Sequence, residues 1–174
     1  ASSFSALPAS AFKSEYSKGS VTEASFSGVK GSAIQFYGST ADLNRVNFDS
    51  ITTVAIEIDG RSTVRSNDSG ILKSGTAIVC RGGSKGEIEG STVADCGVGV
   101  AVFGGVPEFG PSKLVMSGSL VDRTPVPFLV EESSSLSFNQ KLIMHNGAEL
   151  ASLLEKIAGH EQPLIGEVKN EAEK

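Results

Sequence analysis

The feature of this sequence that most constrains its fold is a regular 22-residue repeat. Ile34, Ile56, Ile78 and Val100 follow one another at this constant interval, although the segments around them are rich in glycine and serine. A fixed period of this length is typical of solenoids, in which each repeat buries its apolar face only by stacking on its neighbours. The sequence therefore predicts a stack of similar coils.

Apolar residues alternate with polar ones inside each repeat, which is typical of half-buried strands. Serines at similar positions mark the expected coil starts: Ser20, Ser39, Ser62, Ser84, Ser112 and Ser134. A first strand in each coil is expected to bury Ala41, Leu43, Val64, Ile88, Leu114, Met116, Leu136 and Phe138. A middle strand is expected to bury Phe26, Phe48, Ile71, Val93 and Leu120. A last strand is expected to bury the pairs Ile34/Phe36, Ile56/Ile58, Ile78/Cys80, Val100/Val102 and Phe128/Val130.

Three short strands joined by turns cannot pair with one another inside one coil, because each turn points the next strand in a new direction. They must pair with the next coil, about 4.8 Å away, so that equivalent side chains stack into ladders. Burial of each aliphatic member contributes roughly 1.5–3 kcal/mol before the entropy of ordering is counted. The prediction is an all-β rod of about six coils, roughly 30 Å long.

At this point the chain resembles the right-handed parallel β-helix superfamily typified by pectate lyases. The likeness covers residues 18–139 and rests on the 22-residue spacing, the Gly-Ser coil starts and the stretch STVADCGVGVAVFG. The resemblance implies a right-handed, single-stranded parallel β-helix. The segment VPEFGPSKLVMSGS also looks like a late coil in the β-helical tails of larger exported bacterial proteins.

The two ends of the chain depart from the repeat. Residues 1–17 are expected to form a lead-in or cap, and residues 140–174 a C-terminal helix followed by a charged tail. Asn146 followed by Glu149 is a capping-box pattern, and the apolar residues after it have helical spacing. An amphipathic helix is therefore predicted over residues 147–158, ending before Gly159.

The outward positions of the last strands become apolar along the rod. They are, in order, Gln35, Glu57, Val79, Ala101 and Leu129. A bare apolar patch is unusual on a soluble monomer. Val79, Ala101 and Leu129 are therefore expected to form an interface, either with the C-terminal helix through Leu153 or with a second subunit in a homodimer.

Composition narrows the choice of partners. The chain has 15 Lys plus Arg against 20 Asp plus Glu, and no basic stripe, which argues against binding of nucleic acid. Its longest uncharged runs are too short and too rich in glycine for a membrane helix, so no membrane insertion is expected. We expect a domain within a larger exported protein, located outside the cytoplasm.

The resemblance to β-helix enzymes does not extend to their catalytic motifs. Strings typical of polygalacturonan hydrolases, such as Asn-Thr-Asp, Asp-Asp and Gly-His-Gly, are absent from the sequence. Asp49, Asp95 and Asp122 suggest at most a loose acidic row, and we expect neither a metal site nor another cofactor. Cys80 is expected at an inward position, without a disulfide to Cys96.

Two features suggest a ligand site. The stretch Gly104 to Pro111, GGVPEFGP, interrupts the 22-residue step and should form a loop in which Glu108 and Phe109 offer a carboxylate beside a stacking surface. The alternative is a loop that only covers the apolar face. Arg61, Arg65 and Arg81 are candidates for gripping a sugar carboxylate or sulfate, unless they are simply solvated surface charges.

Two functions from different classes follow from these features. The first is a non-catalytic β-helix scaffold or recognition domain, for a polysaccharide or another protein domain. The second is a small lyase or hydrolase that acts on an acidic polysaccharide. The missing acidic cluster favours the first.

Overall fold

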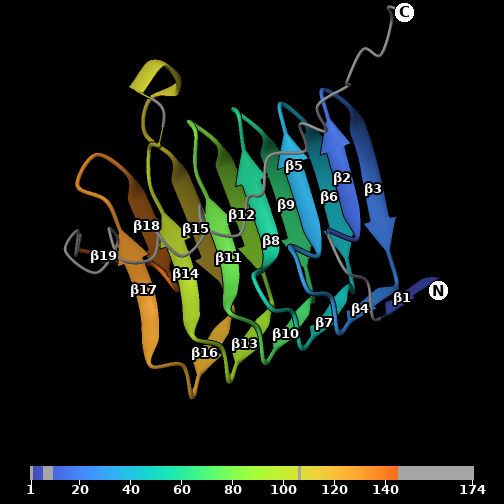
Figure 1. Cartoon of the computed structure of the whole chain (residues 1–174). Helices are drawn as coiled ribbons and strands as arrows, with labels where there is room; N and C mark the ends of the chain where they lie inside the picture. Colours follow the sequence, from blue (N-terminus) through green and yellow to red (C-terminus); the bar gives the residue numbers. More distant parts are fainter. Residues whose placement is uncertain (1, 6–9, 106, 145–174) are drawn as a thin grey trace, which may run out of the picture.

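The repeat folds as a parallel β-solenoid of about six turns, with three short strands per turn (Figure 1). The computed structural model describes residues 2–5, 10–105 and 107–144. Equivalent strands stack into three sheets, named A, B and C here, which enclose the apolar core. The parallel stacking predicted from the repeat is confirmed.

The sheets are built as follows. Sheet A contains β1 (Ser2–Ser5), β4 (Ala24–Ser27), β7 (Asn47–Asp49), β10 (Gly70–Leu72), β13 (Thr92–Ala94) and β16 (Leu120–Asp122). Sheet B contains β2 (Phe12–Glu15), β5 (Ile34–Tyr37), β8 (Val54–Asp59), β11 (Thr76–Cys80), β14 (Val98–Val102) and β17 (Val126–Val130). Sheet C contains β3 (Lys18–Thr22), β6 (Thr40–Asn44), β9 (Thr63–Asn67), β12 (Lys85–Glu89), β15 (Lys113–Ser117), β18 (Ser135–Phe138) and the antiparallel β19 (Lys141–Ile143). A short 3-10 helix, η1 (Pro107–Phe109), lies between β14 and β15.

The two ends of the solenoid differ from its middle. Strands β1 and β2, within the region expected to form a lead-in, pair in parallel with β4 and β5. At the other end, β19 pairs antiparallel with β18. The predicted helix 147–158, including Leu153, lies outside the described residues. The described part of the chain has no helix that is long and apolar enough to span a membrane.

The interior consists of the expected ladders, with one correction. Ile56 pairs with Ile34 and Ile78, and Val100 pairs with Phe128, so the ladder that defined the repeat continues through the longer step. In sheet A the ladder ends on Val121, which pairs with Val93, and not on Leu120 as predicted. Leu120 faces outward and is 55% exposed.

A column of serines connects sheets B and C. The amide N–H of Ser39 donates to Ser62 Oγ (3.0 Å), that of Ser62 to Ser84 Oγ (3.1 Å) and that of Ser112 to Ser134 Oγ (3.1 Å). The prediction was wrong for the first coil. Ser20 lies in β3 opposite Asp42, and the N–H of Ser17 donates to Ser39 Oγ instead (3.3 Å). The column satisfies backbone groups that the tight corners leave without a strand partner.

Both cysteines are free and buried, and Cys80 occupies the predicted inward ladder. Burial raises the pKa of the Cys80 thiol from 9.0 to about 12. The unfolded chain loses this proton near pH 9, whereas the folded chain keeps it to about pH 12. The stabilisation is therefore complete below pH 9 and is lost as the pH rises from 9 to 12.

We expect Cys80→Val to remove this pH dependence, because its ladder neighbours Ile58 and Val102 already surround the site with aliphatic groups. In the unchanged chain the thiol should lower the free energy of unfolding by up to about 1.4 kcal/mol per pH unit above its ordinary pKa. Urea unfolding of both proteins between about pH 8 and 10.5 measures the difference. Parallel pH curves for the two proteins would show that Cys80 does not titrate as proposed.

Candidate functional site

Two turns that are longer than their counterparts one repeat earlier lie at the corner between sheets B and C. Ala41 pairs with Val64, a 23-residue step, because Arg61 is an extra residue in the turn after β8. Gly86 pairs with Leu114, a 28-residue step, because the segment between β14 and β15 is longer than its counterpart one turn earlier. The longer loop carries η1 and stands above the ends of the strands (Figure 1).

The long loop folds back across the preceding turns to reach Arg61. Nη2 of Arg61 donates to the carbonyl oxygen of Glu108 (2.8 Å), and the guanidinium carbon lies 5.1 Å from the centroid of the Phe109 ring. Gly83 makes this approach possible, since a Cβ there would lie 2.1 Å from the Phe109 carbonyl oxygen and its φ is +70°. We call Arg61, Gly83, Glu108 and Phe109 the insertion corner.

Two tyrosines continue this corner toward the first turns of the solenoid. Tyr16 packs against Gly38 and Tyr37 against Gly60, where any Cβ would lie within 2.6 Å of the ring. The tyrosine rings contact each other edge to face, with centroids 5.5 Å apart, and hydrogen bonding to Tyr16 raises the pKa of Tyr37. Tyr16 is 77% exposed. The edge between sheets B and C therefore presents aromatic groups along several turns.

Arg61 differs from the other four arginines of the chain in its partners. Those four each form an ion pair with a carboxylate of a neighbouring turn: Arg45 with Glu23, Arg65 with Glu87, Arg81 with Glu57 and Asp59, and Arg123 with Asp95. Arg123 also pairs with the adjacent Asp122. Stacking explains the pattern, because residues one repeat apart become neighbours. One repeat away from Arg61 stand Ser39 and Gly83. No carboxylate in the described ranges is paired with Arg61.

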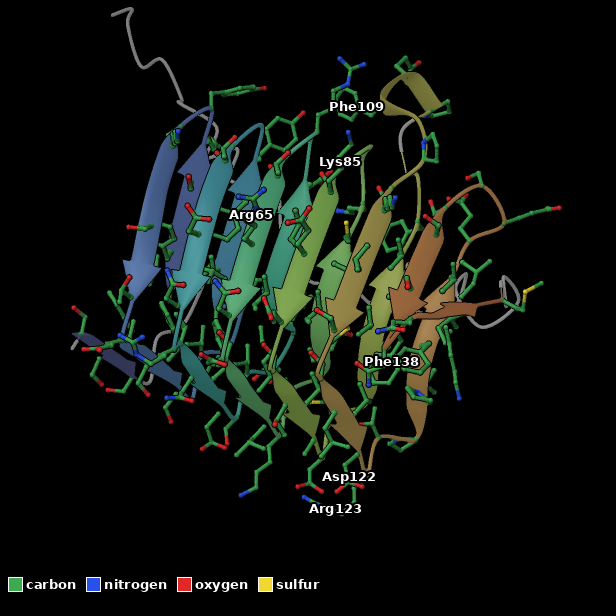
Figure 2. All side chains as sticks on the ribbon, turned by 180° about the vertical axis from the view of Figure 1, so that it is seen from behind. Arg65, Lys85, Phe109, Asp122, Arg123 and Phe138 are labelled. Carbon is green, nitrogen blue, oxygen red and sulfur yellow. The ribbon has the colours of Figure 1, made fainter. Side chains whose placement is uncertain are left out.

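The three arginines grouped by sequence occupy separate surfaces. Arg61 joins Glu108 and Phe109, as the loop prediction requires, but Arg65 lies on the outer flank of sheet C, away from Phe109 (Figure 2). Arg81 lies on the outer side of sheet B, where Nη2 contacts Glu57 Oε1 (2.8 Å) and Nε contacts Asp59 Oδ2 (3.0 Å). Arg65 and Arg81 are therefore held in ion pairs with carboxylates of neighbouring turns.

The outer face of sheet B has a polar end and an apolar end. Glu57 is only 3% exposed and accepts hydrogen bonds from Gln35 Nε2 (2.8 Å) and Ser32 Oγ (3.4 Å), in addition to its pair with Arg81. The expected interface residues Val79, Ala101 and Leu129 stack on one another in register. They form a second apolar cluster, separate from the interior core, with Val54 and Phe103. All of its members are at most 1% exposed.

The acidic row expected at Asp49, Asp95 and Asp122 is not a cluster. Asp49 and Asp122 share one ladder but are separated by Leu72 and Ala94. Asp95 and Asp122 both contact Arg123, whose hydrogen bond lowers the pKa of Asp95 (Figure 2 shows Asp122 and Arg123 together). Within the ranges that the structure describes, no three potential metal ligands converge.

Comparison with known proteins found no match for this chain among protein-family models, curated proteins or solved structures. The likeness to pectate lyases therefore stays a prediction, and the site has to be interpreted from its own chemistry.

Proposed function

We propose that this chain is a non-catalytic β-helix recognition domain that binds an acidic carbohydrate at the insertion corner, within a larger exported protein. We expect the coil to be right-handed, which is the usual hand of connections between parallel strands. The proposal rests on one observation, the presentation of Arg61 without a carboxylate partner among the described residues.

Arg61 is suited to bind an anionic sugar substituent. A guanidinium is planar, remains charged and matches a carboxylate or sulfate with paired hydrogen bonds. Its contacts with the Phe109 ring and the Glu108 carbonyl fix its orientation but do not neutralise its charge. The side chain of Arg61 therefore loses its conformational entropy on folding, and binding of a ligand does not have to immobilise it again.

The rest of the corner supplies features that a sugar chain requires. Aromatic rings offer faces for the apolar side of a sugar, and Tyr16 and Tyr37 present them on the two turns that precede the one with Arg61. The turns are held by parallel strands at a spacing of about 4.8 Å, which gives the edge a fixed shape. An extended ligand that lies along the edge would contact successive turns.

The carboxylates near the corner support recognition more than catalysis. Hydrolysis of glycosides uses two carboxyl groups that flank the scissile bond, and lyase chemistry requires a positioned base. Glu57 and Asp59 are both paired with Arg81, and Glu57 is buried. Their positive partner and their hydrogen bonds give them a structural role on the outer face of sheet B.

The test is binding of the full chain to an array of neutral, uronic and sulfated glycans, followed by calorimetry with oligogalacturonate. We expect Arg61→Gln to weaken binding of oligogalacturonate about tenfold or more, because one charge-assisted pair contributes roughly 1.5–3 kcal/mol. Arg65→Gln is the matched control and should bind unchanged. Binding should also weaken as salt is added.

Two outcomes would contradict the proposal. The first is the absence of binding to every uronic and sulfated glycan on the array. The second is cleavage of an acidic polysaccharide by the purified chain, detected as new reducing ends or unsaturated products. Cleavage would favour the lyase or hydrolase, and the carboxylates near the corner would then be the candidates for its catalytic base.

A further inference from the structure

The apolar cluster on the outer face of sheet B is buried although its side chains point away from the core. Val79, Ala101 and Leu129 alternate with the inward residues of β11, β14 and β17, and each is at most 1% exposed. Because they are buried in a structure of one chain, other residues of the same chain cover them there.

The described strands do not provide this cover. Sheets A and C lie on the other side of the core from the outer face of sheet B, and no labelled strand crosses that face (Figure 1). The loop with η1 stands at the corner, where it contacts Arg61 and Gly83. Of the segments outside the described ranges, only residues 145–174 are long enough to cross four strands.

We propose that residues 147–158 dock in cis on this face and cover the apolar cluster. The segment has Leu150, Leu153, Leu154 and Ile157 at helical spacing, so that a helix here would present one apolar stripe. The described chain ends at Met144, just after β19, and β19 lies at the same end of the rod as β17 (Figure 1). The docked segment would therefore begin over Leu129.

The dimensions of segment and cluster match. A helix of 12 residues is about 18 Å long, and four strands at a spacing of about 4.8 Å span roughly 14 Å. The cluster occupies four neighbouring strands, from Val54 in β8 to Leu129 in β17. Beyond it the face becomes polar at Gln35 and Glu57, which are already hydrogen-bonded to each other. An apolar stripe of this length thus covers the apolar end and stops at the polar one.

This docking makes the outer face of sheet B an internal surface. A partner could reach Val79, Ala101 or Leu129 only by displacing the segment, which leaves the insertion corner as the accessible recognition surface. The inference does not depend on carbohydrate binding, because it concerns a different face and different residues.

The test uses a reporter thiol at Ala101→Cys in the full chain, with labelling by a soluble maleimide. The native Cys80 and Cys96 are buried and serve as internal reporters of an intact core. We expect the reporter to label at least about tenfold more slowly than an exposed reference thiol at Leu120→Cys. Adding Leu153→Glu should raise the reporter rate about tenfold or more, and the matched Ser152→Glu should leave it unchanged.

The outcomes separate the possible occupants. A reporter that stays protected in Leu153→Glu would overturn the proposal, as would fast labelling in the unchanged segment. Protection that appears only as protein concentration rises would assign the face to a second copy. If Leu153→Glu exposes Cys80 and Cys96 as well, hydrogen exchange of the unsubstituted chain decides: slow exchange over residues 147–158 supports docking, and exchange at random-coil rates refutes it.

Discussion

Arg81→Ala should lower the free energy of unfolding by about 3–5 kcal/mol, because it leaves a buried carboxylate without its cation. Arg81 is 22% exposed at its side chain, and its partner Glu57 is only 4% exposed. Gln35 and Ser32 still donate to Glu57 after the substitution, but they carry no charge. Chemical denaturation at neutral pH measures the loss.

The matched control is Arg65→Ala on sheet C. Arg65 and Glu87 also pair across neighbouring turns, at 2.9 Å, but their side chains are 64% and 65% exposed. Exposed pairs of this kind contribute less than about 1 kcal/mol. Equal losses for the two substitutions would mean that the pair of Arg81 with Glu57 is as open to water as the pair on sheet C, which would contradict the ion-pair prediction.

Phe48→Ala should destabilise the chain by about 3–5 kcal/mol, since it opens a cavity inside a ladder of the core. Phe48 is 1% exposed and stacks on Phe26, with ring centroids 5.3 Å apart and an interplanar angle of 10°. Phe26 in turn stacks on Phe4 in the first turn, at 4.8 Å. The substitution should therefore also loosen β1, which thermal unfolding and hydrogen exchange can follow together.

Leu120→Ala is the comparison that tests the register of sheet A. The sequence places Leu120 in the same ladder as Phe48, whereas the structure places Val121 there and leaves Leu120 more than half exposed. We expect Leu120→Ala to change stability by no more than about 0.5 kcal/mol, as for a surface site. A loss of several kcal/mol at Leu120 would show that sheet A is shifted by one residue.

Most of the core could be predicted from the sequence, because stacking turns a simple spacing into contact. The ladder through Ile34, Ile56, Ile78 and Val100 needs only the 22-residue step. The error at Leu120 arose because apolarity was given more weight than spacing. The 28-residue step that leads from Val100 to Phe128 also leads from Val93 to Val121, so this signal was already in the sequence.

The candidate site was predictable only in part. The 22-residue step also places Asp59 beside Arg81, which explains why Arg81 belongs to an ion pair and not to the ligand group. No such rule connects Arg61 with Phe109, which lie on different turns and meet because the long loop folds backward over Gly83. The direction in which a loop folds depends on tertiary packing, and a repeat pattern does not encode it.

The most direct test of the account is removal of residues 106–111, followed by calorimetry with oligogalacturonate. The deletion joins Gly105 to Ser112 and restores the turn Phe103-Gly104-Gly105-Ser112, which matches Arg81-Gly82-Gly83-Ser84 one turn earlier. We predict that the shortened chain still unfolds cooperatively, with stability within about 1 kcal/mol of the parent, because the ladders remain intact. We also predict that it binds oligogalacturonate about tenfold or more weakly, because Arg61 loses both of its supports. Undiminished binding by a folded deletion variant would contradict the assignment of recognition to the insertion corner.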